Sequence, residues 1–132
     1  MLDGTIMITP LYAAIAALIF VGLSFRTLLL RRKFKIGIGT GRNEALARAI
    51  GVHANFAEYT PISLLLIFFL ETLHGTVVWV HVLCIALIAG RILHAYGVSQ
   101  INEDFRFRVV GMILTFGCLI SASSRLISSY LF

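Results

Sequence analysis

The most constraining feature of this sequence is a long uncharged stretch near its start. No charged residue lies between Asp3 and Arg26, and this stretch contains the apolar run from Ile8 to Phe25. A helix of about 20 apolar residues crosses a bilayer. The run is too long for the apolar core of a signal peptide, and its positive charges follow it rather than precede it. We therefore predict that it is a retained transmembrane helix.

Three further apolar runs follow, separated by short polar segments, and the predicted spans are residues 7–29, 43–73, 76–97 and 107–130. Only 13% of the residues are charged, whereas a soluble domain carries about 25%. The alternating segments of about ten residues that build a membrane barrel are absent from the sequence. Residues 1–132 are therefore predicted to form one domain, an all-α membrane protein whose four transmembrane helices run alternately up and down.

The basic residues indicate how the chain is oriented. The densest cluster, Arg31 to Lys35, follows the first predicted span, and the positive-inside rule places it in the cytoplasm. Both termini and the turn at residues 74–76 are then expected outside, and the loop near residues 97–106 inside. The net charge of +5 is explained by residues that face anionic lipid, so we expect membrane lipids and no nucleic acid as partners.

A polar stripe runs along the second predicted span. Arg48, Gly51, Asn55 and Glu58 follow one another at steps of three, four and three residues, and this spacing places them on one face of a helix. His53 points to another side. Because ionisable residues at membrane depth usually face the protein interior or a wet cavity, this stripe is a candidate functional site.

Basic residues of the last two spans are expected at the same depth as this stripe. Arg91 and His94 are three residues apart and share a face of the third span, whereas Arg106 and Arg108 are two apart and point in different directions. Guanidinium groups bind carboxylates bidentately, and Glu58 can accept a hydrogen bond from an ammonium group. The three helices together predict a site for a small anion that carries carboxylates and an amine.

Each of these residues also has a purely structural interpretation. The arginines of the third and fourth spans lie near membrane ends, where such side chains reach toward lipid headgroups. Arg48 and Glu58 are able to form an ion pair, and Asn55 is able to join two helices by a hydrogen bond. Cys84 and Cys118 lie in apolar runs without the spacing of a metal or redox pair, so we predict two buried thiols and no metal site.

The pattern R-x4-H-x-N-x2-E-x2-P, from Arg48 to Pro61, resembles the signature of the MAPEG family, the membrane-associated proteins of eicosanoid and glutathione metabolism. The stretch from Gly90 to Gly97 resembles the third-span Arg-x-x-His element of that family, and Arg108 resembles its thiol-activating arginine. The chain is most similar to the small bacterial branch of the family. This resemblance implies a homotrimer in the bacterial inner membrane, with glutathione bound between protomers near the cytoplasmic face.

The resemblance also implies roles for individual residues. Glutathione, the co-substrate, would be held by Arg48, Asn55, Glu58, Arg91 and His94. Arg108 would stabilise its thiolate, with Arg106 as the alternative for this position. Gly51 and Ala54 stand where well-studied members carry further arginines, and Val98 stands where several carry a tyrosine. These departures imply weaker glutathione binding, a different thiol or a loss of activity.

The function implied is that of a glutathione-dependent membrane transferase or peroxidase. A nearby cation lowers the pKa of a free thiol from about 8.5, and the thiolate then attacks an apolar electrophile dissolved in the lipid. The alternative is a membrane protein that binds glutathione or lipid without turnover. A small multidrug exporter ranks last, because that class needs an acidic residue in its first span and the run from Ile8 to Phe25 contains none.

Overall fold

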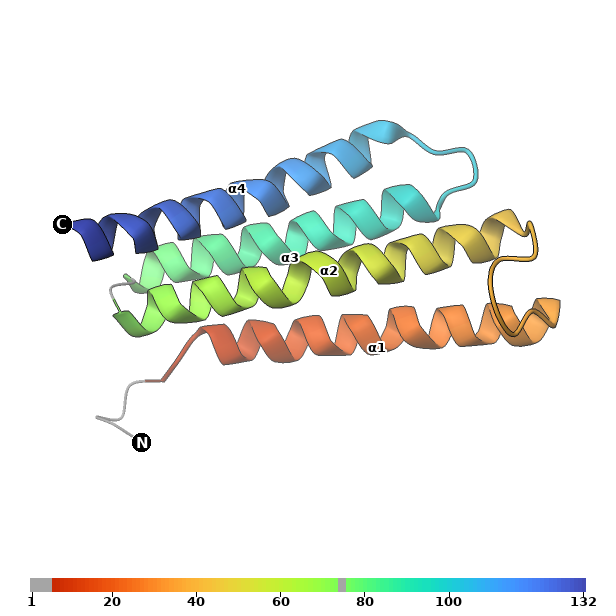
Figure 1. Ribbon diagram of the computed structural model, residues 1–132, viewed down its shortest axis with the longest axis horizontal. Coiled ribbons are helices and arrows are strands. Elements are labelled where there is room, and N and C mark those ends of the chain that lie inside the picture. The colour runs from red at the N-terminus through yellow and green to blue at the C-terminus, as the bar shows by residue number, and fades with distance from the viewer. Residues whose placement is uncertain (1–5, 74–75) are drawn as a thin grey trace.

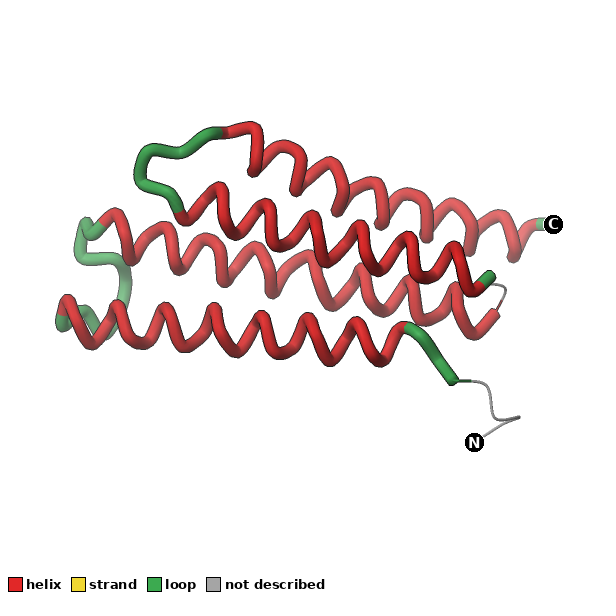
Figure 2. Tube along the Cα trace, turned by 180° about the vertical axis from the view of Figure 1, so that it is seen from behind, coloured by secondary structure: helices red, strands yellow, loops and turns green. Residues whose placement is uncertain are grey.

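The computed structural model describes residues 6–73 and 76–132, which form four α-helices. The helices are α1 (Thr9–Phe34), α2 (Glu44–Leu73), α3 (Val77–Ser99) and α4 (Phe105–Leu131), and each is long and apolar enough to cross a membrane. They run alternately up and down, so the start of α1 and the end of α4 lie at one end of the bundle (Figures 1 and 2). The predicted four-helix membrane fold is confirmed. Residues 74 and 75 of the expected outer turn lie outside the described part.

Three helices extend a few residues beyond the predicted spans: α1 and α3 at their C-terminal ends and α4 at both ends, whereas α2 lies within its predicted span. α1 continues through Arg31, Arg32 and Lys33, because arginine and lysine favour helix and their charges suit the negative end of the helix dipole. It ends at Phe34, and the C-cap residue Lys35 has the left-handed conformation with φ of 54°. α4 begins at Phe105 rather than at residue 107, because the side chain of Asp104 caps it by accepting a hydrogen bond from a backbone N–H group.

α1 packs mainly against α2 and leaves much of its surface exposed. Ile8, the described residue directly before α1, provides no side-chain cap for the first N–H groups of this helix. Instead, the backbone N–H groups of Ile8 and Thr9 donate to the carboxylate of Glu71 near the end of α2, the second of them at 2.9 Å. This carboxylate satisfies donors that a helix start leaves unpaired, and it lies at the positive end of the helix dipole.

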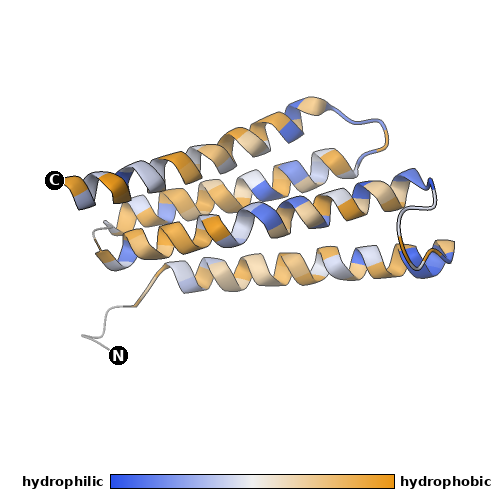
Figure 3. Ribbon diagram, in the orientation of Figure 1, coloured by the Kyte–Doolittle hydropathy of each residue, from blue (hydrophilic) through white to orange (hydrophobic). Residues whose placement is uncertain are grey.

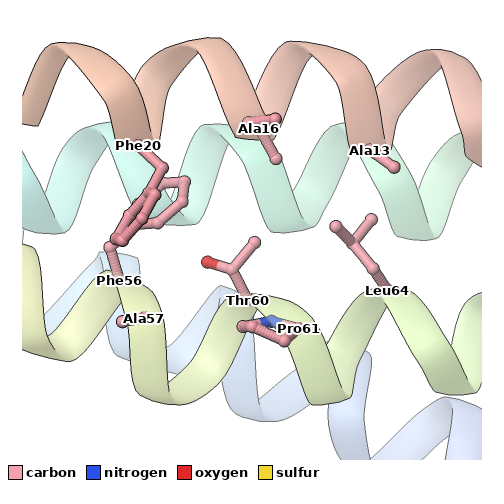
Figure 4. A pocket seen from close by; sticks show the side chains of 9 residues that line it. Ala13, Ala16, Phe20, Phe56, Ala57, Thr60, Pro61 and Leu64 are labelled. Atoms are coloured by element: carbon pink, nitrogen blue, oxygen red, sulfur yellow. The ribbon is translucent and has the colours of Figure 1, made fainter.

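An apolar groove of about 270 Å³ lies between α1 and α2 (Figure 4). Small and aromatic side chains line it, among them Ala16, Phe20 and Phe56. Thr60, also in the groove wall, is 3% exposed, and its hydroxyl has no hydrogen-bond partner among the residues that the structure describes. Pro61 follows it within α2 without ending the helix.

α3 and α4 approach each other closely because two glycines face each other. A Cβ atom on Gly111 would lie 2.6 Å from the carbonyl oxygen of Gly90 and 2.7 Å from the backbone nitrogen of His94. Contacts of this length are shorter than van der Waals distance, so a larger residue would push the helices apart. Small residues allow this kind of backbone approach in membrane bundles. The approach places His94 directly against α4.

We expect Gly111→Ala to destabilise the bundle by about 1–3 kcal/mol, the usual cost of overpacking, because its Cβ would meet backbone atoms that cannot rotate away. The control is Gly117→Ala on the same helix, since a Cβ there has nothing within 4 Å. The unfolding midpoint in a denaturing detergent titration measures both variants. Equal midpoints for the two would contradict the close packing of α3 on α4.

Candidate functional site

An open cleft of about 350 Å³ lies between α2, α3 and α4. It is lined by Gly51, Asn55, His94, Val98, Arg108 and Met112. Three of these residues, Asn55, His94 and Arg108, are predicted site residues, and the structure brings them together from three different helices. Figure 3 shows that polar residues gather in the half of the bundle nearer to the α1–α2 and α3–α4 loops. The cleft lies in that half.

Arg91 is almost completely buried at 1% exposure and joins three helices. Its Nη1 donates to Oδ1 of Asn55 at 2.5 Å, and its Nε donates to Oγ1 of Thr115 at 3.0 Å. Its Nη2 lies 3.2 Å from the sulfur of Met112, and its guanidinium carbon lies 5.5 Å from the ring centre of Tyr59. The charge of Arg91 is therefore surrounded by neutral hydrogen-bond acceptors and an aromatic ring.

The bond from Arg91 determines how Asn55 faces the cleft. A guanidinium group only donates hydrogen bonds, so the amide oxygen of Asn55 must point toward it. The NH₂ group of Asn55 is then left to donate to a ligand. Arg91 does not itself line the cleft, and its contact with the cleft is through Asn55, which it positions. A direct contact between Arg91 and glutathione stays a prediction.

A buried carboxylate, Glu103, bridges two of the predicted arginines. Its side chain is 3% exposed. Arg48 Nη1 donates to Oε2 of Glu103 at 3.0 Å, and Arg108 Nη2 donates to the same oxygen at 2.8 Å. Arg108 Nε lies 2.7 Å from Oε1, at ion-pair distance but without the angles of a hydrogen bond. Arg48 also donates to the carbonyl of Val98 at 3.0 Å.

The prediction from sequence did not include Glu103. The residue lies in the loop between α3 and α4, where no helical period relates its position to the stripe on α2. The one available signal was chemical: three acidic or basic residues, Glu103, Asp104 and Arg106, follow closely on the end of an apolar span. Such a cluster beside predicted arginines is a reason to consider pairing, but it does not identify the partners.

The remaining predicted residues lie farther from the cleft. Glu58 is exposed on α2, one turn beyond Asn55. Arg106 points away from Arg108 and pairs with Asp104 at 2.9 Å, with 90% of its side chain exposed. Its guanidinium holds the pKa of the Asp104 carboxyl below the ordinary value, chiefly through this side-chain hydrogen bond. Of the two alternatives for the thiol-activating position, Arg108 alone lines the cleft.

Two expectations about residues outside the site are confirmed. Cys84 and Cys118 are buried thiols in the interior of the bundle. His53 lies on another side of α2 from the cleft. Its Nε2 is 2.9 Å from the hydroxyl of Ser24 on α1, and its ring stacks on Phe20 with centres 4.7 Å apart.

We expect Thr115→Val to destabilise the protein by about 1–3 kcal/mol, because it leaves Nε of the buried Arg91 guanidinium without an acceptor. Thr60→Val is the matched control: Thr60 is also buried in a helix, but its hydroxyl bonds to nothing, so the same exchange of atoms should cost little or stabilise. Unfolding midpoints of the two variants test this. A loss in Thr60→Val as large as that in Thr115→Val would show that the bond to Arg91 contributes nothing.

Comparisons with known proteins relate this sequence to a family. The family model described as "MAPEG family" matches residues 9–128. The inner membrane protein YecN of Escherichia coli strain K12 is 37% identical over 115 residues, which cover 86% of this chain and 86% of the relative. YecN of Escherichia coli O6:H1 strain CFT073 matches to the same extent. No solved structure matches the chain at a significant level. These matches confirm the family resemblance.

Proposed function

Because this chain belongs to the MAPEG family, we propose that it is a glutathione-dependent transferase of the inner membrane, which activates a thiol for attack on apolar electrophiles. The observation that carries the proposal is the position of Arg108, which lines one cleft together with His94 and Asn55. A guanidinium keeps its charge at any physiological pH, so it stabilises a thiolate without giving up a proton.

The side chains around the cleft suit the chemical groups of glutathione, which carries two carboxylates, an ammonium group, amides and a thiol. In this proposal Arg48 binds a carboxylate, and the NH₂ group of Asn55 donates to a carbonyl or carboxylate oxygen. His94 and Gly51 also line the cleft, and the absence of a side chain at Gly51 leaves room there. Glu58, one turn away on the exposed side of α2, accepts from the ammonium group.

The reaction itself needs little chemistry from the protein. The thiol loses its proton to water, and each unit by which its pKa falls corresponds to about 1.4 kcal/mol in favour of the thiolate. The electron pair of sulfur then forms a bond to the carbon of the electrophile, and the leaving group, such as a halide, departs with the old bonding pair. Holding both reactants in the cleft supplies the remaining acceleration.

Arg108→Ala is expected to abolish the ultraviolet absorbance of the bound thiolate while leaving most glutathione binding intact. A preorganised charge of this kind contributes about 2–4 kcal/mol, so conjugation with an aryl halide should slow about 30- to 1000-fold. Arg106→Ala is the control, because its side chain is exposed and pairs with Asp104. If Arg106→Ala removes the thiolate signal and Arg108→Ala does not, the roles of the two arginines are reversed.

The same assay separates the transferase from a protein that only binds glutathione or lipid. The pairing of Arg108 with Glu103 favours this second candidate, because a guanidinium whose charge is compensated by a carboxylate stabilises a thiolate less. Glu58→Gln should weaken glutathione binding with little effect on the thiolate of the molecules that still bind. An unmodified protein that binds glutathione but shows no thiolate at saturation would establish the binding-only function.

We also propose that the protein is a homotrimer. Glu58 is exposed and stands near the middle of α2, where a charged side chain facing lipid costs about 3 kcal/mol on insertion scales. A second copy of the chain would cover this carboxylate, and the family resemblance implies three copies around a shared site. Mass measurement in a native detergent should give a trimer. A preparation that contains only monomer or dimer would contradict the proposal.

The orientation proposed for the trimer follows from the basic cluster. Arg32 and Lys33 are exposed at the end of α1, and the positive-inside rule favours the cytoplasm for that end. The cleft would then open toward the cytoplasm, where glutathione is dissolved, while the termini lie outside. The apolar substrate would arrive through the surrounding lipid.

A further inference from the structure

We propose that Glu103 is a tethered counter-ion, whose carboxylate occupies the anion position between Arg48 and Arg108 until an anionic ligand takes its place. This inference rests on the proposed function for the identity of the ligand as glutathione. It assigns to Glu103 a role in selecting the ligand, which neither the family match nor the relatives' names describe.

The geometry of Glu103 is that of a bound carboxylate ligand. Its two oxygens lie 2.7–3.0 Å from three guanidinium nitrogens of two arginines. Such charge-assisted contacts are the ones by which arginine recognises free carboxylates. A carboxylate of glutathione is the same chemical group, so it competes for the same N–H donors. Both ions cannot use these donors at once.

The position of Glu103 in the chain allows the exchange without unfolding a helix. Gln100 ends α3, with its N–H bonded to the carbonyl of Gly97, and Asp104 begins α4 as its cap. Only residues 101–103 lie between these two fixed points, and none of them is helical. Rotation of this short segment withdraws the carboxylate while Arg48 keeps its bonds to Glu44 and to the carbonyl of Val98.

The charges around the cleft explain why a counter-ion is present. Without Glu103, the guanidinium groups of Arg48 and Arg108, which both donate to one of its oxygens, would lie close together without this counter-charge. Like charges at close range repel each other. A ligand enters only if it compensates these charges as well as Glu103 does, so the exchange favours an anion that bridges both arginines over one that pairs with a single arginine.

The test compares Glu103→Gln with the unmodified protein, using inorganic sulfate and glutathione as separate probes in thermal-shift titrations. Removal of the internal competitor should tighten the binding of both probes at least about tenfold, within the usual range of coupling between two ligands. Asp104→Asn is the control, because it removes a neighbouring carboxylate that pairs with exposed Arg106 and keeps a residue that caps helices. It should leave sulfate binding unchanged.

The two probes distinguish failure of this inference from failure of the proposed function. Sulfate that binds Glu103→Gln no tighter than the unmodified protein would overturn the role of Glu103, whatever glutathione does. Tighter sulfate binding with no glutathione binding in either protein would support the counter-ion and reject glutathione as the ligand. Tighter binding in Asp104→Asn to the same degree would show a general charge effect and would also overturn the inference.

A second measurement keeps Glu103 in place, in case its replacement prevents folding. Asn102 is exposed beside it, so Asn102→Cys serves as a reporter for a charged maleimide, with Cys84 and Cys118 buried and protected. Saturating sulfate should raise the labelling rate of this cysteine severalfold, because the exchange moves residues 101–103. An unchanged rate at a sulfate concentration that shifts the melting temperature would overturn the inference.

Discussion

The guanidinium of Arg91 is buried in a membrane bundle, and among the described residues it has no carboxylate partner. Transfer of an unpaired ion into a protein interior costs several kcal/mol even after relaxation. The arrangement is sustained because α2 and α4 offer Arg91 the oxygens of Asn55 and Thr115, and because the ring of Tyr59 faces its charge. The side chain of Arg91 thus connects α2, α3 and α4. Its positive charge lies behind Asn55, a residue of the cleft wall, and makes the electrostatic potential of the cleft more positive.

The packing of α3 against α4 determines where the positively charged side chains lie. The contact between Gly90 and Gly111 lets α3 and α4 approach closely enough for Arg91 on α3 to reach Thr115 on α4. The same approach places His94 and Arg108 on one cleft. The positive charge that results is balanced by Glu103, which the chain provides from a loop. The stability of the bundle and the proposed ligand binding therefore depend on the same few arginines, so a substitution of one of them should affect both.

The sequence predicts the parts of the site that helical geometry determines. The spacing of Arg48, Gly51 and Asn55 places them on one face of α2. Because the helices alternate in direction, the end of α3 and the start of α4 lie at the same depth as the start of α2. It does not predict which arginine is structural, because the burial of Arg91 depends on the contact between α3 and α4. The sequence also does not predict the bond between Glu103 and Arg48 or the Glu71 cap, because in each case the two partners are more than fifty residues apart and only the packing of the helices brings them together.

The carboxylate of Glu71 gives the assembly of the bundle an order in time. A protein is synthesised from its N-terminus, so the residues of α1 are made before Glu71, whose carboxylate satisfies the first N–H groups of that helix. Until α2 packs against α1, these groups need other hydrogen-bond partners such as water, since 62 residues separate Thr9 from Glu71 in the chain. The hydrogen bonding at the start of α1 is therefore completed only when the end of α2 has packed against it.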